Sequence, residues 1–280
     1  MIEIKDLCKE FDGFTAVDHL NLCIETGEFF GLLGPNGAGK TTTISMISTV
    51  LLPSQGQILL DGKVLDRKAA AQKRKLSVIT QEFSMRQDMT MDEVMEYQGR
   101  LYFMPRKEIK RKTEDLFEFA GLSEFHRRTV RHLSGGMKRK LMICRGLLTD
   151  PEIMLLDEPT AGMDAVARRQ MWNLLRQLHA QGITILLTTH YIDEAQNLCD
   201  RVALIDKGKL DSVDTPQALI ESLGCFAVDL PSEETLESHY FQKREDAIDY
   251  LSKAGENAML RNTTLEDVFV QRVGKQLTKK

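Results

Sequence analysis

Gly34-Pro35-Asn36-Gly37-Ala38-Gly39-Lys40-Thr41 is the stretch that decides the fold of this 280-residue chain. It matches the pattern G-x-x-x-x-G-K-[ST], follows the apolar run Phe29–Leu33 and precedes a helical pattern over Thr42–Val50. Glycines let backbone N–H groups turn inward around an anion, and a helix start adds positive potential. Lys40 supplies a cation for the terminal phosphates and Thr41 a hydroxyl for Mg²⁺. The alternative is a chance Gly-rich turn before a helix. The complete eight-residue pattern between a strand and a helix argues against this alternative.

Short apolar runs of strand length recur along the chain. They are Phe29–Leu33, Leu76–Thr80, Ile153–Asp157, Ile183–Thr188 and Val202–Asp206. Stretches with helical spacing separate several of these runs, which indicates an α/β fold with a largely parallel sheet. Continuous apolar strands such as IMLL and ITILL are typical of a sheet that is buried on both faces.

Two parts of the chain depart from this alternation. Residues 85–150 contain three helical patterns and no strand, which predicts a helical insertion. The pattern changes again after Asp214: Thr215-Pro216 opens a helix that ends near Gly224, and CFAVDL is a candidate strand. A capping box is expected over residues 263–266. We therefore predict one large domain at 1–222, with the helical subdomain inserted at about 85–150, and a small C-terminal appendage at 223–280.

Bulk composition excludes several function classes. The net charge is −4, which gives no general reason to bind nucleic acid. The five cysteines are scattered without a C-x-x-C pair, so reduced thiols are expected. The opening MIEIKDLCKEF carries charges and no apolar run, so no secretory signal is expected there. No segment approaches the roughly 20 apolar residues that cross a bilayer, so any membrane role would need a partner.

Two carboxylates follow a buried strand at Ile153–Pro159, with the sequence IMLLDEP. Asp157 at the strand end can hold a Mg²⁺ ion. Because side chains alternate along a strand, Glu158 would point elsewhere and could face an attacking water. Taken alone, an apolar run followed by Asp-Glu is common at strand ends. The phosphate-binding pattern upstream favours the catalytic interpretation.

A second candidate anion site lies at Leu133-Ser134-Gly135-Gly136-Met137. Ser134 reads as a helix N-cap, and the two glycines leave the first amides of the helix open. In isolation this is an ordinary helix cap. Together with the first phosphate-binding pattern, it predicts a second phosphate contact.

The order of these motifs, followed by a strand that ends in His190, resembles the ATP-binding subunits of ABC transporters over residues 1 to about 222. The resemblance implies that Gln81 reaches the metal and the water and borders a transmembrane partner. It implies that His190 contacts the γ-phosphate, that Asp164 is the acidic residue of the D-loop and that Phe11 stacks on adenine. A lone glutamine, histidine or phenylalanine in such places is often structural, and Phe11 could be a core residue.

The resemblance also implies a complete fold and site. The fold is a P-loop NTPase core with a mostly parallel sheet, an N-terminal antiparallel β portion, an inserted helical subdomain and a small C-terminal α+β appendage. ATP and Mg²⁺ are the implied cofactors. The implied catalytic residues are Glu158, His190, Lys40 and Gln81, and the implied metal ligands are Thr41, Gln81 and Asp157. The implied nucleotide contacts are Phe11, Gly34, Pro35, Asn36, Gly37, Ala38, Gly39, Lys40, Thr41, Thr42, Ser134, Gly135, Gly136 and Asp164.

The implied partners are integral membrane permease subunits and a second ATP-binding subunit, either identical or a close homologue, at the cytoplasmic face of the cell membrane. LSGGMKRKL, TAGMD and TTLEDVF look most like the branch that exports drugs, lipids or polysaccharides. Met137 stands where the family more often has glutamine, and Phe11 where it more often has tyrosine. The alternative is an ABC ATPase that acts on ribosomes or DNA. The short interval between the motifs has no sustained heptads, which argues against the repair type.

Overall fold

A mostly parallel six-stranded sheet forms the centre of the computed structural model, which describes residues 1–231, 236–254 and 257–274. The strand order is β10-β9-β3-β8-β7-β6. The strands span Phe29–Leu33 (β3), Leu76–Ile79 (β6), Ile153–Asp157 (β7), Thr184–Thr189 (β8), Arg201–Asp206 (β9) and Lys209–Asp214 (β10). Only β10 runs antiparallel to its neighbour. Every residue of β3, β7 and β8 is buried, as expected for a sheet that is covered on both faces.

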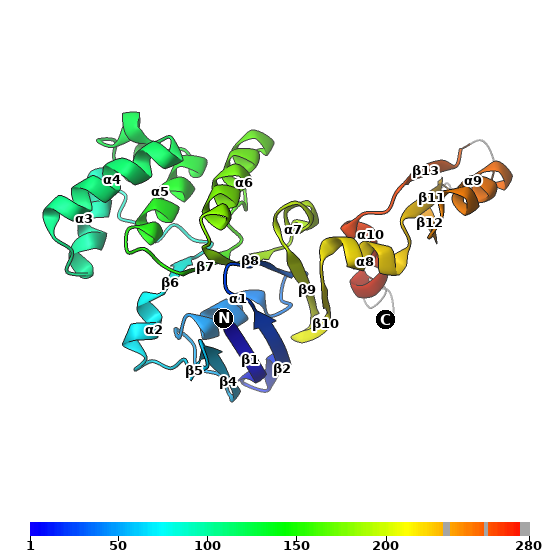
Figure 1. Ribbon diagram of the computed structural model, residues 1–280, viewed down its shortest axis with the longest axis horizontal. Coiled ribbons are helices and arrows are strands. Elements are labelled where there is room, and N and C mark those ends of the chain that lie inside the picture. Colours follow the sequence, from blue (N-terminus) through cyan, green and yellow to red (C-terminus); the bar gives the residue numbers. More distant parts are fainter. Residues whose placement is uncertain (232–235, 255–256, 275–280) are drawn as a thin grey trace.

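A second, antiparallel sheet covers one side of the central sheet (Figure 1). Its order is β2-β1-β4-β5, with strands Ile2–Phe11 (β1), Phe14–Ile24 (β2), Gln55–Leu60 (β4) and Lys63–Val64 (β5). Helix α1 (Lys40–Ile47) packs between the two sheets, because its apolar residues join one core cluster with residues from both. Alternate residues of β3 serve the two sides: Phe30 and Leu32 face this cluster, whereas Phe29 and Leu33 face the opposite one.

The helical insertion lies near the β6 edge of the central sheet, on the side away from the antiparallel sheet (Figure 1). It contains α3 (Met91–Leu101), α4 (Arg106–Ala120) and α5 (Gly135–Leu147), while the short α2 (Ala70–Arg74) precedes β6. Thr90 and Glu93 form a capping box at the start of α3, and α4 ends at Gly121 with a φ of 66°. The sequence pattern predicted these three helices and their location.

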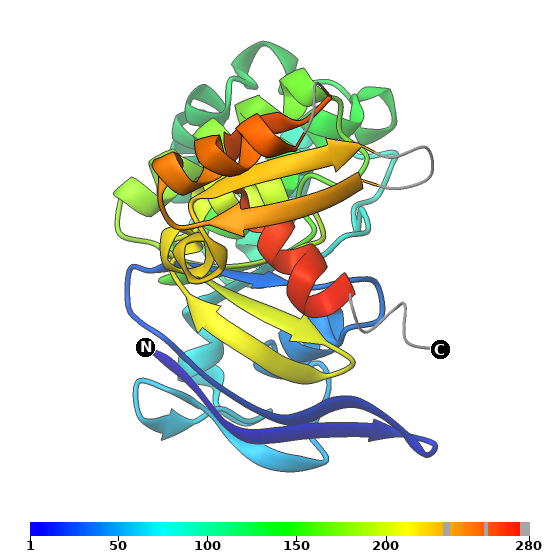
Figure 2. The same cartoon turned by 90° about the vertical axis from the view of Figure 1, so that its right-hand side faces the viewer.

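The C-terminal part begins with α8 (Pro216–Leu223), capped by Thr215 as expected. A three-stranded sheet of order β12-β11-β13 follows, with β11 (Phe226–Pro231), β12 (Leu236–Phe241) and β13 (Met259–Asn262). Helix α9 (Arg244–Lys253) covers this sheet (Figure 2). Helices α6 (Ala165–Ala180) and α7 (Ile192–Leu198) belong to the large N-terminal part, where they follow β7 and β8 of the central sheet.

Helix α10 (Leu265–Phe269), followed by the π-helical turn Val270–Gly274, returns to the main body. It packs on α7 and α8, and its Leu265 and Val268 join the core cluster on the face of the central sheet away from the antiparallel sheet. Its capping box is formed by Thr264 and Asp267. The expected box over residues 263–266 was therefore displaced by one residue, because the helix starts one residue later.

Two further boundaries differ from the expectation. Helix α1 begins at Lys40, inside the Gly-rich pattern, and ends at Ile47. The expected extension to Val50 was wrong, because Thr49 adopts a φ of 61° and turns the chain out of the helix. No helix in the described part of the chain is long and apolar enough to span a membrane.

The contact between α5 and β6 leaves no room for a side chain at Gly146. A Cβ there would lie 2.4 Å from Ser77 Oγ and 3.0 Å from Ile79 Cδ1. We expect overpacking in Gly146→Ala to lower the free energy of unfolding by about 1 to 3 kcal/mol. The higher helix propensity of alanine, about 1 kcal/mol over glycine, offsets only part of this loss. Denaturant unfolding measures this change. The Ser77→Ala/Gly146→Ala double variant should recover most of the loss, and an unchanged single variant would contradict the close contact.

Candidate nucleotide-binding site

A cavity of about 640 Å³ opens at the carboxyl ends of the central parallel strands, the edge at which α/β sheets bind ligands. It brings together ten of the predicted residues: Phe11, Asn36, Gly37, Gly39, Lys40, Thr41, Thr42, Gln81, Glu158 and His190. Five lining residues were not predicted: Phe14, Ala16, Ala161, Gly162 and Tyr191.

The Gly-rich loop takes its shape from backbone that other residues cannot adopt. Gly37 and Gly39 have φ values of 82° and 101°. A Cβ at Gly39 would lie 2.4 Å from the carbonyl oxygen of Ala16, and one at Gly34 would lie 2.4 Å from that of Ile205. Glycine is therefore required for both conformation and close approach. Ala38 is buried, and its carbonyl accepts a hydrogen bond from Gly208 N–H.

The ammonium group of Lys40 is folded into the loop that precedes it. Nζ donates to the carbonyl oxygens of Gly34 at 2.8 Å and Pro35 at 3.0 Å, and the residue is only 5% exposed. Burial lowers the pKa of Lys40, while the nearby charges of Glu158 and Asp157 act in the opposite direction. A cation is thus held ready at the base of the cavity.

Two hydroxyl groups hold the buried carboxylate of Asp157. Thr41 Oγ1 donates to Asp157 Oδ1 at 3.2 Å, and Thr188 Oγ1 donates to the same oxygen at 2.5 Å. Asp157 is at the end of β7 and Thr188 is in the neighbouring β8. A carboxylate beside a threonine hydroxyl is the all-oxygen donor set that Mg²⁺ prefers.

The carboxylate of Glu158 lies between a histidine and a lysine. Its Oε1 is 3.1 Å from His190 Nδ1 and 3.8 Å from Lys40 Nζ. Glu158 was expected to point away from Asp157 because side chains alternate along a strand, and that reason was wrong. Strand β7 ends at Asp157, and Glu158 turns away through a left-handed φ of 47°. Such a conformation is strained for a non-glycine residue. Hydrogen bonds from Glu158 N–H to the carbonyl and hydroxyl oxygens of Thr188 maintain it.

His190 follows β8 and is flanked by an aromatic residue that the sequence analysis missed. The ring of Tyr191 lies 4.1 Å from the His190 ring, and the Arg168 guanidinium lies 4.4 Å from the Tyr191 ring. Tyr191 therefore buttresses the histidine from the side. Its position next to a predicted site residue was the only sequence signal for it.

Two exposed phenylalanines form the outer wall of the cavity. Phe11 ends β1 and Phe14 begins β2, joined by a tight turn at Asp12-Gly13. The Lys9 ammonium group lies 5.0 Å from the Phe11 ring. The two rings offer flat apolar faces of the kind that can stack on a nucleobase. The close spacing of Phe14 and Phe11 could have signalled the second aromatic.

Gln81 contributes an exposed side chain to the cavity, while its backbone is fixed from outside. Its carbonyl oxygen accepts a hydrogen bond from Arg139 Nη2 at 2.9 Å. Arg139 was not predicted as a site residue, because an arginine in a charged segment gives no signal that it is buried.

The remaining predicted contacts lie elsewhere. Ser134, Gly135, Gly136 and Asp164 line a separate cavity of about 530 Å³, which shares Ala161 and Gly162 with the first. Ser134 caps α5 by accepting from Met137 N–H at 3.3 Å, and Asp164 caps α6 by accepting from two amides. A Cβ at Gly135 would meet nothing within 4 Å, so the start of α5 is open. Within one chain, the Gly-rich loop and the Ser134–Gly136 segment therefore line different cavities.

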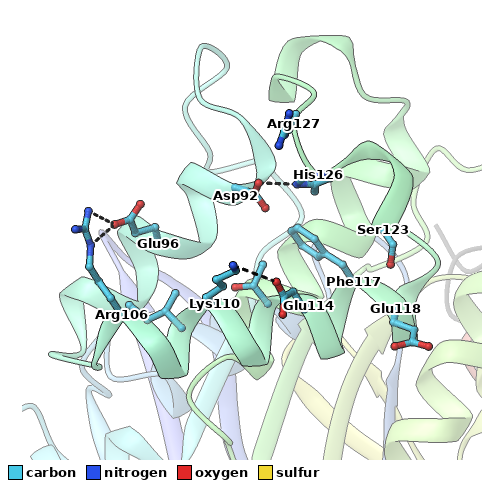
Figure 3. A pocket seen from close by; sticks show the side chains of 12 residues that line it. Asp92, Glu96, Arg106, Lys110, Glu114, Phe117, Glu118, Ser123, His126 and Arg127 are labelled. Carbon is cyan, nitrogen blue, oxygen red and sulfur yellow. Dashed lines mark hydrogen bonds and ion pairs between the residues drawn. The ribbon is translucent and has the colours of Figure 1, made fainter.

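A larger cavity of about 760 Å³ lies on the helical subdomain and contains none of the predicted site residues (Figure 3). Its charged groups pair with one another, as in the contacts of His126 with Asp92 and of Arg106 with Glu96. Size alone does not identify the chemical site, because the smaller cavity holds the convergent cation, carboxylates and glycine-rich loop.

Comparison with known proteins gives a consistent relationship. A family model described as ABC transporter matches residues 17–161. The Nod factor export ATP-binding protein I of Burkholderia lata is 36% identical over 297 residues, which cover 99% of this chain and 98% of that protein. The linearmycin resistance ATP-binding protein of Bacillus subtilis is 35% identical, over 80% of this chain and 72% of its own length.

Solved structures agree with this relationship. The protein cbiO1 of Clostridium perfringens, described as part of an ABC transporter complex, has a TM-score of 0.72 at 28% identity, over 78% of this chain and 89% of its own. A dimeric ATP-binding cassette bound to ADP and phosphate has a TM-score of 0.68 at 26% identity, over 77% of this chain and 98% of its own. The chain belongs to the ABC transporter family and is an ATP-binding, ATP-hydrolysing subunit that powers transport.

Proposed function

We propose that this ATPase works as a head-to-tail pair at the cytoplasmic face of the cell membrane and drives export through separate integral membrane permease subunits. The second ATP-binding subunit is a copy of this chain or a close homologue. The observation that carries the proposal is the cluster of Lys40, Glu158 and His190 in one cavity, with the Ser134–Gly136 segment facing another.

The separation of the two cavities supports the paired arrangement. The first cavity contains the Lys40 cation and the candidate base Glu158. The open start of α5 lies instead in the second cavity, with Ser134. A partner that supplies its own Ser134–Gly136 segment would complete the γ-phosphate contacts of the first cavity, with Asp164 nearby at the junction. Open amides at a helix start bind anions, so the phosphate itself would join the two surfaces.

The residues of the first cavity fit Mg-ATP hydrolysis. Thr41 and Asp157 would hold Mg²⁺, with the side-chain oxygen of Gln81 available nearby, and the ion would neutralise charge on the phosphate oxygens. Phe11 and Phe14 would hold the adenine. Lys40 would exchange its carbonyl contacts for the β- and γ-phosphates.

Hydrolysis then follows from the position of Glu158. Its carboxylate accepts a proton from a water that attacks the γ-phosphorus, while the bond to the β-phosphate oxygen breaks and ADP leaves with the electron pair. His190 holds the Glu158 carboxylate and faces the same cavity, where it can contact the transferred phosphate. Lys40 offsets the negative charge that develops.

Export and a membrane partner rest on two kinds of support. Relatives are named for Nod factor export and linearmycin resistance. At the end of α3, Tyr97, Leu101, Tyr102 and Phe103 are exposed, and Phe103 is 90% exposed. An apolar group of this kind on the helical subdomain is suited to covering by a partner protein. The relatives give no support to a role on ribosomes or DNA.

Glu158→Gln should bind ATP with near-parent affinity and lose hydrolysis by about 10²-fold or more, because the shape remains while the base is lost. Calorimetry with ATP and a steady-state phosphate-release assay measure the two effects. The variant should also accumulate as an ATP-bound dimer. Glu152→Gln, which alters an exposed carboxylate just before the same strand, should hydrolyse ATP at the parent rate. Parent-rate turnover by Glu158→Gln would reject Glu158 as the base.

Ser134→Arg tests the paired arrangement, because it places bulk at the open start of α5. We expect the isolated subunit to bind ATP normally but to lose ATP-driven dimerisation and at least about tenfold of its hydrolysis rate. Light scattering in the Glu158→Gln background measures the dimer. The variant also removes a helix cap, so Gly135→Asp, which leaves that cap in place, should give the same result through negative charge.

Glu114→Arg is the control, since Glu114 lies on α4 of the helical subdomain and lines the larger cavity, whereas it does not line the cavity of Ser134 (Figure 3). It should dimerise as the parent does. Normal dimerisation by both Ser134→Arg and Gly135→Asp would overturn the head-to-tail arrangement.

A further inference from the structure

We propose that Arg139 is a positioning residue that fixes helix α5 to the backbone of Gln81, and so couples one ATP site to the other. Arg139 is 2% exposed and is among the largest fully buried side chains of the described residues. Nη1 donates to the carbonyl oxygen of Thr80 at 2.5 Å, and Nη2 donates to that of Gln81 at 2.9 Å. The two hydrogen bonds hold consecutive peptide groups at the point where β6 leads into the cavity.

This burial of a cation is unusual for a core position, because it lacks a paired carboxylate. Among the described residues no carboxylate forms an ion pair with its guanidinium nitrogens within 4.0 Å, and the charge of Asp157 acts on it from farther away. Its partners are two neutral carbonyl oxygens, Met142 Sδ at 4.0 Å from Nη1, and the ring of Phe83, whose centroid lies 5.2 Å from the guanidinium carbon. Burial lowers the pKa of Arg139, and the charge of Asp157 opposes this effect only in part. Burying a charge without a counterion in direct contact is costly, and an apolar residue would fill the same space at a lower cost. The arrangement is therefore suited to a positioning role rather than to stability.

The guanidinium group has the geometry that this task requires. Its planar fork presents two parallel N–H groups and remains charged, so it can bind adjacent carbonyl oxygens in fixed orientation. A lysine ammonium group is a point charge and cannot impose that orientation. Arg139 thus determines where the Gln81 backbone lies, and consequently where the Gln81 side chain enters the cavity.

Both ends of the connection lead to nucleotide contacts. Arg139 lies in the second turn of α5, and Ser134 caps the first turn of the same helix. Gln81 lines the first cavity, whereas Ser134 lines the second. In a head-to-tail pair these cavities would serve different ATP molecules. A shift of α5 on binding the partner's phosphate would therefore move the peptide groups of Thr80 and Gln81 through a hydrogen-bonded contact.

A second arginine of α5 provides a natural contrast. Arg145 donates from Nη1 to Ser84 O at 3.1 Å and from Nη2 to Ser84 Oγ at 3.2 Å. It anchors the same loop three residues farther along the chain, and Ser84 does not line the nucleotide cavity. Loss of Arg145 removes an arginine–carbonyl contact from the same helix and leaves the Gln81 peptide held.

The inference rests on the proposed function, and its test separates the two. The variants are Arg139→Ala and Arg139→Lys, compared with Arg145→Ala in the otherwise unaltered full chain. Calorimetry measures ATP affinity, and steady-state kinetics give kcat, KM and the Hill coefficient for ATP. We expect Arg139→Ala to keep ATP affinity within about twofold, to lose at least about tenfold in kcat and to lose cooperativity. Arg145→Ala should retain kcat within about twofold.

Chemical rescue distinguishes positioning from general damage. Methylguanidine at low, non-denaturing concentration should restore part of the kcat of Arg139→Ala, because it can occupy the vacated space and bind the same carbonyl oxygens. Arg139→Lys should remain slow despite its retained charge. If Arg139→Ala does not fold, Arg139→Lys decides the question through the same split between kcat and affinity.

Parent-like kcat in the Arg139 variants would overturn the inference. An equal loss in Arg145→Ala, or a loss of ATP affinity that parallels the loss of kcat, would also overturn it. Failure of the proposed function gives a different result: the parent chain itself would then show no ATP-driven dimer and no cooperative hydrolysis.

Discussion

The Lys40 ammonium group, buried against the carbonyl oxygens of its own loop, is the interaction on which the nucleotide site depends. A buried cation must be solvated by the protein, and here two peptide carbonyls provide that solvation before any phosphate does. They can do so only because glycines allow the loop to close tightly around the side chain. The close approaches of Gly34 to Ile205 and of Gly39 to Ala16 then attach the loop to the adjoining strands. The central sheet completes the arrangement, because β7 ends at Asp157 and Glu158 follows directly, which places Glu158 Oε1 3.8 Å from the ammonium nitrogen.

Much of this arrangement could be predicted from the sequence. The Gly-rich pattern, the buried strands and the carboxylates after β7 are local signals, and each one carries its own physical reason. The structure brings ten of the predicted residues into one cavity and places Ser134, Gly135, Gly136 and Asp164 in another. Their roles stay predictions until they are tested by substitution.

What could not be predicted depends on contacts between distant segments. The left-handed turn at Glu158 is maintained by Thr188 from a neighbouring strand, so no local pattern could reveal it. The burial of Arg139 depends on the carbonyl groups of Thr80 and Gln81, which are far from it in sequence. A charged residue in a basic segment is ordinarily taken as solvent-exposed, and here that expectation fails. The observed ends of helix α1 and the position of the last capping box differ from the predicted ones by one to three residues, because helix ends are decided by single backbone angles.

The packing of α10 has a consequence for how the C-terminal part can vary. Helices α8 and α10 pack on each other, and α10 also contacts α7, which directly follows the His190 segment. Leu265 N–H donates to Gln196 Oε1 at 2.9 Å, which fixes the start of α10 to α7. Topologically, residues 226–262 are therefore an excursion of the chain between two packed helices rather than a free tail. The cost of closing such an excursion grows only slowly with its length, so this part can lengthen, shorten or be exchanged while the base that closes it stays constant.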